Sequence, residues 1–378
     1  MSDRREPTRE RPPGTLRIGQ IAGVDVLIRS SWLLVAILIS VLMADHIDRV
    51  APGLGELRYV AGLAFAVLLY LSVLMHEISH ALMAKAFSMP VRSVTLHFLG
   101  GVTEIEGESK TPWREFCISI IGPITSILVA AAAWGLTFIA PEGLLGFACQ
   151  ALALTNLAVG VLNLVPGMPL DGGRVLRAIV WGITGNDVTG TLIAGWGGRI
   201  VAVLVLGYPS VLSYFFDTEP TVVDYLFAAV IAVFMWGGAT QTIMSAKVRR
   251  KLPWIRARAL GRRALTIVED TPLSEAVRAA RETQAGGIVV LDRRGEIFGI
   301  VNEAAVLATP EERRPWLSVA SVTRRMETGM ALPADLIGED LVRAMQRTPA
   351  PEYVLTEQDG SVYGVLTTDD VDRAFVQA

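Results

Sequence analysis

Long apolar runs extend from the N-terminal region to about Met244, and they constrain the fold of this chain more than any other feature. A run of about 20 apolar residues can cross the hydrocarbon core of a bilayer as an α-helix, and the sequence contains about six candidates. The predicted spans are residues 32–43, 60–87, 116–139, 145–164, 192–211 and 222–244. The fold class expected is an α-helical polytopic membrane protein followed by a soluble α/β module.

Charged residues divide the chain into three predicted parts. Residues 1–16 are rich in Arg and Pro and are expected to form a disordered cytoplasmic tail, and residues 17–246 form the membrane domain. Residues 247–378 have a soluble composition rich in Arg, Glu and Asp. The net charge of −3 gives no indication of a nucleic-acid partner.

Basic residues predict the orientation of the chain in the membrane. They cluster in the N-terminal tail, at Arg174 and Arg177, and over residues 247–251. If six spans alternate, all three clusters lie on one side of the bilayer, and the positive-inside rule makes that side cytoplasmic. We therefore expect a multi-pass protein of the cell membrane with both termini and the soluble module in the cytoplasm.

The second predicted span carries the pattern H-E-x-x-H at residues 76–80. Residues i and i+4 share one face of a helix, so His76 and His80 can bind a single metal ion. Glu77 can then act as a general base without being a ligand. Ionisable groups in mid-membrane cost about 3 kcal/mol each, so three together indicate a function rather than ordinary core histidines.

Asp171 and His97 are the candidates for a third metal ligand. The fourth span ends in a stretch, residues 163–174, in which prolines and glycines interrupt the helix around Asp171. Two histidines and one carboxylate form a common catalytic zinc set. Asp171 lies 95 residues beyond His76, however, so an ordinary loop aspartate remains an alternative. His97 is also a chemically possible ligand, but a strand residue facing solvent or lipid headgroups is favoured.

Two short segments predict β-structure beside the membrane helices. Residues 18–28 alternate weakly and indicate a strand pair at the membrane surface. Residues 91–108 indicate a membrane-associated β-hairpin, with Gly100 and Gly101 at a turn that favours glycine. An open edge of this hairpin could hold an extended peptide by main-chain hydrogen bonds. A plain connecting hairpin is the alternative.

The soluble part contains an internal repeat. Residues 288–301 match residues 353–366 at an offset of 65 residues, and residues 275–279 match residues 340–344 at the same offset. Each copy indicates a helix, a strand, a turn, a strand and a helix. Two related copies are expected to pack as one pseudo-symmetric unit.

These motifs together resemble the site-2 protease family, the intramembrane zinc metalloproteases of the M50 type. Residues 76–80 match its first motif, and the run from Asn163 to Gly173, N-x-x-P-x-x-P-L-D-G-G, matches its second. The resemblance implies that Asp171 is the third zinc ligand. It also implies that Glu77 is the catalytic base and that Asn163 donates a hydrogen bond to the substrate or the oxyanion.

The soluble repeat resembles a tandem pair of CBS domains, at about residues 262–310 and 320–376, and the domain order is similar to the CBS-bearing branch of the family. The second copy has the nucleotide-contacting pattern G-h-x-T-x-x-D, ending at Thr367 and Asp370. The first copy has Asn302 and Ala305 at the Thr and Asp positions. At most one adenine-nucleotide site is therefore expected, and a structural or dimerising role is the alternative.

The family resemblance implies one function and leaves two rivals. It implies an intramembrane metalloendopeptidase with one Zn²⁺ per chain, acting in regulated intramembrane proteolysis. Its substrate would be a single-span regulator such as an anti-sigma factor, and paired CBS domains would regulate it or form a homodimer. A CBS-gated transporter or channel also has intramembrane charges and broken helices, although no repeat is visible among these spans. The third alternative is a catalytically inactive scaffold, but the sequence contains all three expected ligands and the glutamate.

Overall fold

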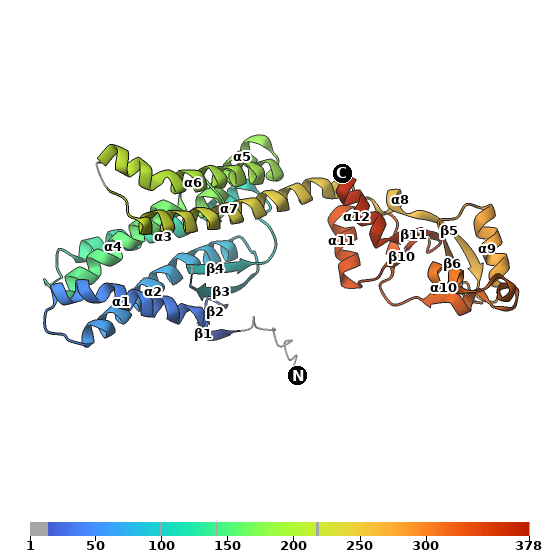
Figure 1. Ribbon diagram of the computed structural model, residues 1–378, viewed down its shortest axis with the longest axis horizontal. Helices are drawn as coiled ribbons and strands as arrows, with labels where there is room; N and C mark the ends of the chain where they lie inside the picture. Colours follow the sequence, from blue (N-terminus) through green and yellow to red (C-terminus); the bar gives the residue numbers. More distant parts are fainter. Residues whose placement is uncertain (1–13, 99, 141, 217–218, 378) are drawn as a thin grey trace. The chain divides into compact units, whose positions relative to one another are not determined.

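A computed structural model describes residues 14–98, 100–140, 142–216 and 219–377, and it divides the chain into two compact units, Met1–Ala246 and Lys247–Ala378 (Figure 1). Most of the predicted tail lies outside the described residues. Its last three residues are described, and two of them belong to strand β1 (Thr15–Ile21), which pairs with β2 (Val24–Arg29) and places Leu16 opposite Ile28. The prediction of a tail up to residue 16 is therefore wrong for Thr15 and Leu16, because their backbone groups have strand partners.

Long apolar helices build the first unit. Five of them in the described residues are long and apolar enough to cross a membrane: α2 (Leu57–Ala86), α3 (Pro112–Leu136), α4 (Leu144–Asn163), α6 (Asp187–Phe216) and α7 (Val222–Lys251). Many large apolar side chains on these helices are exposed, which suits a bilayer rather than water as their surroundings. The unit is thus a helical membrane protein.

The first predicted span, residues 32–43, lies in a helix that is not one of those five. This helix, α1 (Ser31–Val50), continues through Asp45 and Asp48, so these charges end the apolar run but not the helix. Pro52 and Gly53 follow it, and they are the residues that interrupt helical backbone. The predicted count of about six spans is therefore one more than the five helices that satisfy both criteria.

A four-stranded sheet packs on one side of α2. Its order is β1-β2-β3-β4, with β3 (Val91–His97) parallel to β2 and antiparallel to β4 (Gly100–Ile105). Val26, Val94 and Leu96 pack against Tyr70 and Leu74 of α2 in one buried cluster. Gly100 and Gly101 begin β4 instead of forming the turn, and Gly100 has a positive φ of 128°. The two predicted strand pairs thus form one sheet.

A short helix that the sequence did not predict carries Asp171. Helix α5 (Asp171–Thr184) begins directly after the proline-rich stretch, and it packs against α3 and α6. A Cβ atom on Gly172 would overlap the backbone of Leu164, and one on Gly173 would overlap the backbone of Gly167. These glycines therefore let the incoming chain fold closely onto the first turn of α5 instead of breaking the helix.

The second unit is built around a seven-stranded sheet of order β8-β7-β6-β5-β11-β10-β9. Two copies of a strand–helix–strand–strand–helix unit form it, and they meet where β5 pairs antiparallel with β11. The first copy contains β5 (Arg262–Val268), α9 (Leu273–Glu282), β6 (Gly287–Leu291), β7 (Ile297–Val301) and α10 (Glu303–Ala308). The second copy contains β9 (Ala331–Pro333), α11 (Gly338–Arg347), β10 (Glu352–Thr356), β11 (Val362–Thr367) and α12 (Thr368–Gln377), and β8 (Thr323–Arg325) extends the sheet beside β7.

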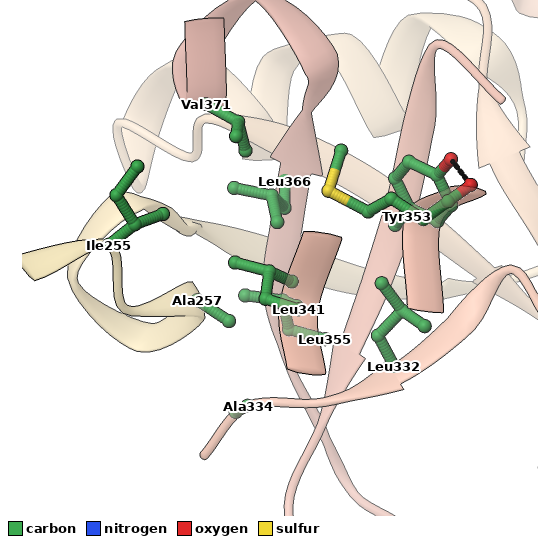
Figure 2. Packing of buried hydrophobic residues seen from close by; sticks show 10 residues of the cluster. Ile255, Ala257, Leu332, Ala334, Leu341, Tyr353, Leu355, Leu366 and Val371 are labelled. Carbon is green, nitrogen blue, oxygen red and sulfur yellow. Dashed lines mark hydrogen bonds between the residues drawn. The ribbon is translucent and has the colours of Figure 1, made fainter. Parts of the chain in front are cut away.

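Each copy has an apolar core between its helices and the sheet. In the second copy, Leu341 of α11, Leu355 of β10 and Leu366 of β11 are completely buried together (Figure 2). The hydroxyl of Tyr353 reaches this core and lies 2.9 Å from the carbonyl oxygen of Thr348 and 3.1 Å from that of Met345. Its polar atom is therefore satisfied inside an otherwise apolar cluster.

Candidate metal and catalytic site

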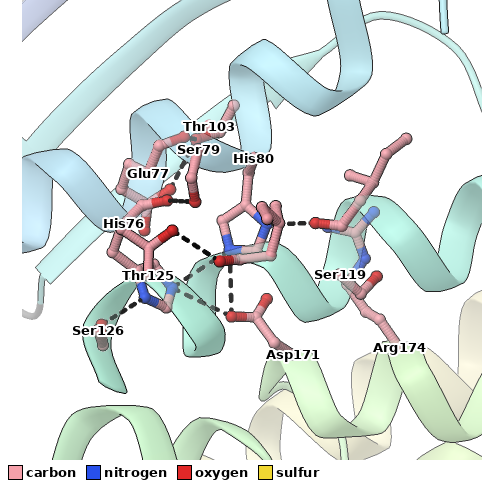
Figure 3. Close-up of polar contacts among 12 residues, drawn as sticks. His76, Glu77, Ser79, His80, Thr103, Ser119, Thr125, Ser126, Asp171 and Arg174 are labelled. Carbon is pink, nitrogen blue, oxygen red and sulfur yellow. Dashed lines mark hydrogen bonds and ion pairs between the residues drawn. The ribbon is translucent and has the colours of Figure 1, made fainter. Parts of the chain in front are cut away.

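Three side chains from two helices converge in the membrane unit (Figure 3). His76 and His80 lie one turn apart on α2, and their Nε2 atoms are 3.2 Å apart. Oδ2 of Asp171, at the start of α5, lies 3.1 Å from Nε2 of His76 and 3.2 Å from Nε2 of His80. Ligands at 2.0–2.1 Å from a tetrahedral zinc ion are about 3.3 Å apart, so these residues fit Zn²⁺.

The hydrogen-bond partner of Nδ1 decides which ring nitrogen of His80 carries the proton. Nδ1 of His80 lies 2.5 Å from the carbonyl oxygen of Ile118, and a carbonyl can only accept a hydrogen bond. Nδ1 therefore carries the proton, and the lone pair of Nε2 faces Asp171 as a metal ligand requires. Nδ1 of His76 lies 2.9 Å from the hydroxyl of Ser126, which orients that ring in the same way.

Helix α3 approaches both imidazoles through a glycine. A Cβ atom on Gly122 would overlap Nε2 of His80 and would also collide with Nε2 of His76. Both histidines are almost completely buried, with exposures of 5% and 4%, so no space exists into which the rings could withdraw. The candidate metal site therefore requires glycine at position 122, and neighbouring Pro123 lies inside the same helix.

Glu77 projects from α2 toward the sheet and does not belong to the group of three ligands. Its Oε2 atom lies 2.7 Å from the hydroxyl of Thr103 on β4. A Cβ atom on Gly101 would overlap the side chain of Glu77, so the glycine backbone lies directly against this carboxylate. The arrangement leaves Glu77 beside the metal site and in contact with a strand.

A buried ion-pair cluster fixes α5 relative to α3. Glu115 of α3 is only 1% exposed, and its Oε1 lies 3.1 Å from Nε of Arg174 and 3.7 Å from Nη1 of Arg177. Arg174 lies one turn after Asp171 on α5, so the pair holds the ligand-bearing end of this helix. A polar cavity of about 180 Å³ adjoins the cluster, with Thr103 and Ser109 in its wall.

The remaining predicted residues of this unit are placed as follows. Asn163 is the half-buried last residue of α4, eight positions before Asp171. His97 ends β3, and within the described residues the only metal-type cluster is that of His76, His80 and Asp171. The structure thus brings together the two histidines and the aspartate, and it does not add His97 to them.

Thr103, Glu115 and Ser126 were not predicted to belong to the site. Each acts across elements that are far apart in sequence, so spacing alone could not reveal them. Retrospective signals exist, since Thr103 shares a strand face with Gly101, and Ser126 lies one helical turn after Gly122.

The soluble unit has a second cavity, of about 430 Å³, on the side of the sheet where Thr367 lies. Arg262, Arg281, Glu303, Glu352 and Thr367 contribute polar atoms to its wall. Asp370 is already engaged: its carboxylate lies 2.6 Å from Arg262, 2.5 Å from Arg373 and 2.7 Å from the hydroxyl of Thr367. Burial raises the pKa of Asp370, but hydrogen bonds from Arg262 and Thr367 outweigh this, so its pKa lies below the ordinary range.

Comparison with known proteins gives two family matches. Residues 64–144 and 139–206 match peptidase family M50, and residues 257–311 match the CBS domain. The chain is 30% identical over 368 residues to "Putative zinc metalloprotease Rip3" of Mycobacterium tuberculosis, covering 94% of this chain and 91% of that protein. It is 24% identical over 310 residues to "Zinc metalloprotease MJ0392" of Methanocaldococcus jannaschii, covering 82% and 84%. Among solved structures, the site-2 protease from M. jannaschii is 24% identical, with a TM-score of 0.42 over 61% of this chain and 95% of that one.

Proposed function

Because this chain belongs to peptidase family M50, the zinc metalloproteases of the site-2 protease kind, we propose that it cleaves a peptide bond within the membrane-spanning segment of another protein. The observation that carries the proposal is the convergence of His76, His80 and Asp171 beside Glu77. His76 and His80 belong to a helix of membrane-spanning length and composition. A hydrolytic site on such a helix suits a substrate that is itself in the bilayer.

The residues divide the chemistry between them. His76, His80 and Asp171 would hold one Zn²⁺, which when bound makes water more acidic and polarises the scissile carbonyl. Glu77 takes the proton from the attacking water and then gives it to the nitrogen of the leaving amine. Asn163 donates a hydrogen bond to the substrate or to the developing oxyanion.

The substrate is held as an extended strand along β4. Within the described residues no strand pairs with the outer edge of β4, and Gly100 and Gly101 keep the start of this strand free of side chains. An added peptide strand gains main-chain hydrogen bonds there, close to Glu77. This suits the unwound helix of a single-span membrane protein, such as an anti-sigma factor, during regulated intramembrane proteolysis. The polar cavity beside Thr103 and Glu115 offers water a route toward the site.

The soluble unit acts as a regulatory or dimerising module of tandem CBS domains, with the second copy at about residues 320–376. The cavity that contains Arg262, Arg281 and Thr367 favours one adenine nucleotide per chain, because two arginines can donate hydrogen bonds to its phosphates. A ribose hydroxyl would share the carboxylate of Asp370 with Arg262, Arg373 and Thr367. Full-length protein is expected to bind adenosine triphosphate, and Thr367→Ala is expected to weaken that binding. Equal affinity in wild type and variant would exclude a contact by Thr367, and no binding by wild type would leave the unit with a structural or dimerising role.

The first experiment measures zinc and cleavage together in detergent-solubilised protein. Wild type and Glu77→Gln are expected to contain about one zinc per chain, whereas Asp171→Ala is expected to lose most of it. Of these three proteins, only wild type should cleave a tagged single-span reporter in liposomes. Glu104→Gln, an exposed glutamate on β4, is the matched control and should retain both properties.

Two outcomes would contradict the proposal. Wild type without zinc would reject the metal site and favour the CBS-gated transporter or channel. Loss of zinc in Glu77→Gln would show that Glu77 has a structural role at the site instead of serving as the base.

A further inference from the structure

One face of strand β4 lies against the catalytic glutamate. Alternate residues of a strand point to the same side, and Gly101, Thr103 and Ile105 are half-buried whereas Val102 and Glu104 are exposed. Gly101 and Thr103 both contact Glu77 from this buried face. Strand β4 is thus a wall of the catalytic site as well as an outer strand of the sheet.

The hydroxyl of Thr103 makes the only side-chain hydrogen bond to Glu77 within the described residues, at 2.7 Å from Oε2. It also lies 3.0 Å from the main-chain oxygen of Glu77, and its single proton goes to one of the two acceptors. A glutamate side chain has several rotatable bonds, whereas a β-branched residue in a strand is restricted at χ1. Thr103 can therefore fix which way the carboxylate of Glu77 points.

We propose that Thr103 is a positioning residue that holds Glu77 in the orientation needed for proton transfer. One oxygen of the carboxylate accepts the threonine hydrogen bond, and the other remains directed at the reacting water. The inference rests on the proposed function, because it requires Glu77 to be the base.

The position of Thr103 also connects the base to the substrate. Thr103 lies within the strand whose outer edge has no partner, two residues beyond Gly101. A peptide that pairs with this edge restrains the backbone of β4, and the restraint passes through one side chain to Glu77. The same strand therefore holds substrate and aims the base, so that Glu77 is best oriented when substrate is bound.

The test compares Thr103→Val, which keeps the shape and strand preference of threonine, with Thr103→Ser, which keeps the hydroxyl. Thr95→Val, in neighbouring strand β3, is the matched control because its side chain has no described contact with Glu77. Each full-length variant is reconstituted with the tagged single-span reporter at varied mole fraction, and kcat, KM and zinc content are measured. Wild type and Glu77→Gln are run beside them.

The expected result is a kcat lowered about 10- to 100-fold in Thr103→Val, the usual effect of losing such a supporting partner, with KM and zinc content unchanged. Thr103→Ser and Thr95→Val should stay close to wild type. An unchanged kcat in Thr103→Val, or an equal loss in Thr103→Ser, would overturn the inference and leave the proposed function intact. If Thr103→Val does not assemble, Thr103→Ala replaces it in the same comparison. Cleavage by Glu77→Gln would reject the proposed function itself.

Discussion

At the scale of single residues, the metal site depends on partners behind its ligands. Ser126 is almost completely buried and lies 2.9 Å from Nδ1 of His76, so Ser126→Ala removes the group that orients this ring. We expect zinc affinity to fall about 10- to 100-fold, as is usual when such a partner is lost. Competition with a zinc chelator measures the effect.

The neighbouring residue provides a matched control for this substitution. Thr125→Ala removes a hydroxyl whose one hydrogen bond among the described residues goes to the carbonyl oxygen of Ile121 in its own helix, and it should leave zinc affinity close to that of wild type. If both variants lose zinc equally, the cause is general disturbance of α3 and not the orientation of His76.

Some residues of the candidate site could be predicted from the sequence, and others could not. His76 and His80 follow from helical spacing alone, and membership of the predicted family is confirmed. Asp171 lies 95 residues away, so its arrival beside the histidines followed only from the family motif, and the structure now places it there. Thr103 and Ser126 could not be predicted, because a lone hydroxyl has no recognisable pattern until the fold brings it to its partner.

At the scale of elements, a buried ion pair sets the position of α5. Glu115→Gln leaves Arg174 and Arg177 without their buried counter-charge, which typically costs about 3 kcal/mol. Because Arg174 follows Asp171 by one turn, the third ligand should shift as well. We expect a lower thermal unfolding temperature together with weaker zinc retention.

An exposed glutamate that pairs with the same arginine serves as the control for Glu115→Gln. Glu108 is about half exposed and lies 3.7 Å from Arg177, so Glu108→Gln should change stability by less than about 1 kcal/mol. Equal effects of the two substitutions would show that burial of Glu115 does not decide the position of α5.

Two elements were predicted incorrectly from the sequence, and both errors have the same physical cause. Prolines and glycines before Arg174 indicated a broken helix, yet Gly172 and Gly173 belong to α5 because close backbone contacts leave no room for a Cβ atom. Gly100 and Gly101 indicated a turn for the same reason, whereas they begin β4 against Glu77. Glycine occurs both where the backbone turns and where another part of the chain lies too close for a Cβ atom, and only the fold distinguishes these two cases.

In the soluble unit, Asp370 predicts a pH-dependent contribution to stability. Its pKa is lower in the folded protein than the ordinary value, so the contribution is present at neutral pH and is lost as pH falls through the folded pKa, below about 4. Asp370→Asn should therefore lower the free energy of unfolding of residues 247–378 by about 1 kcal/mol at pH 7. Denaturant unfolding at several pH values should show the difference from wild type disappearing in acid, whereas exposed Asp369→Asn should produce little change.

At the scale of the whole molecule, the number of membrane crossings decides on which sides of the bilayer the two termini lie. Five helices meet the criteria for a span, which would place the termini on opposite sides, whereas a sixth crossing by α1 places them on one side. Arginines precede α1 at positions 4–11, and basic residues end α7 at positions 247–251, so the positive-inside rule favours six crossings. We therefore expect α1 to cross the bilayer and both termini to be cytoplasmic.

Single cysteines test this topology after Cys117 and Cys149 are replaced by serine. In intact cells a membrane-impermeant maleimide should label Pro52→Cys, in the connection between α1 and α2, but neither Ser2→Cys nor Gln358→Cys. The latter two should become reactive once the membrane is permeabilised, because their side of the bilayer is then accessible. Labelling of both Ser2→Cys and Pro52→Cys in intact cells, or protection of both, would mean that α1 does not cross.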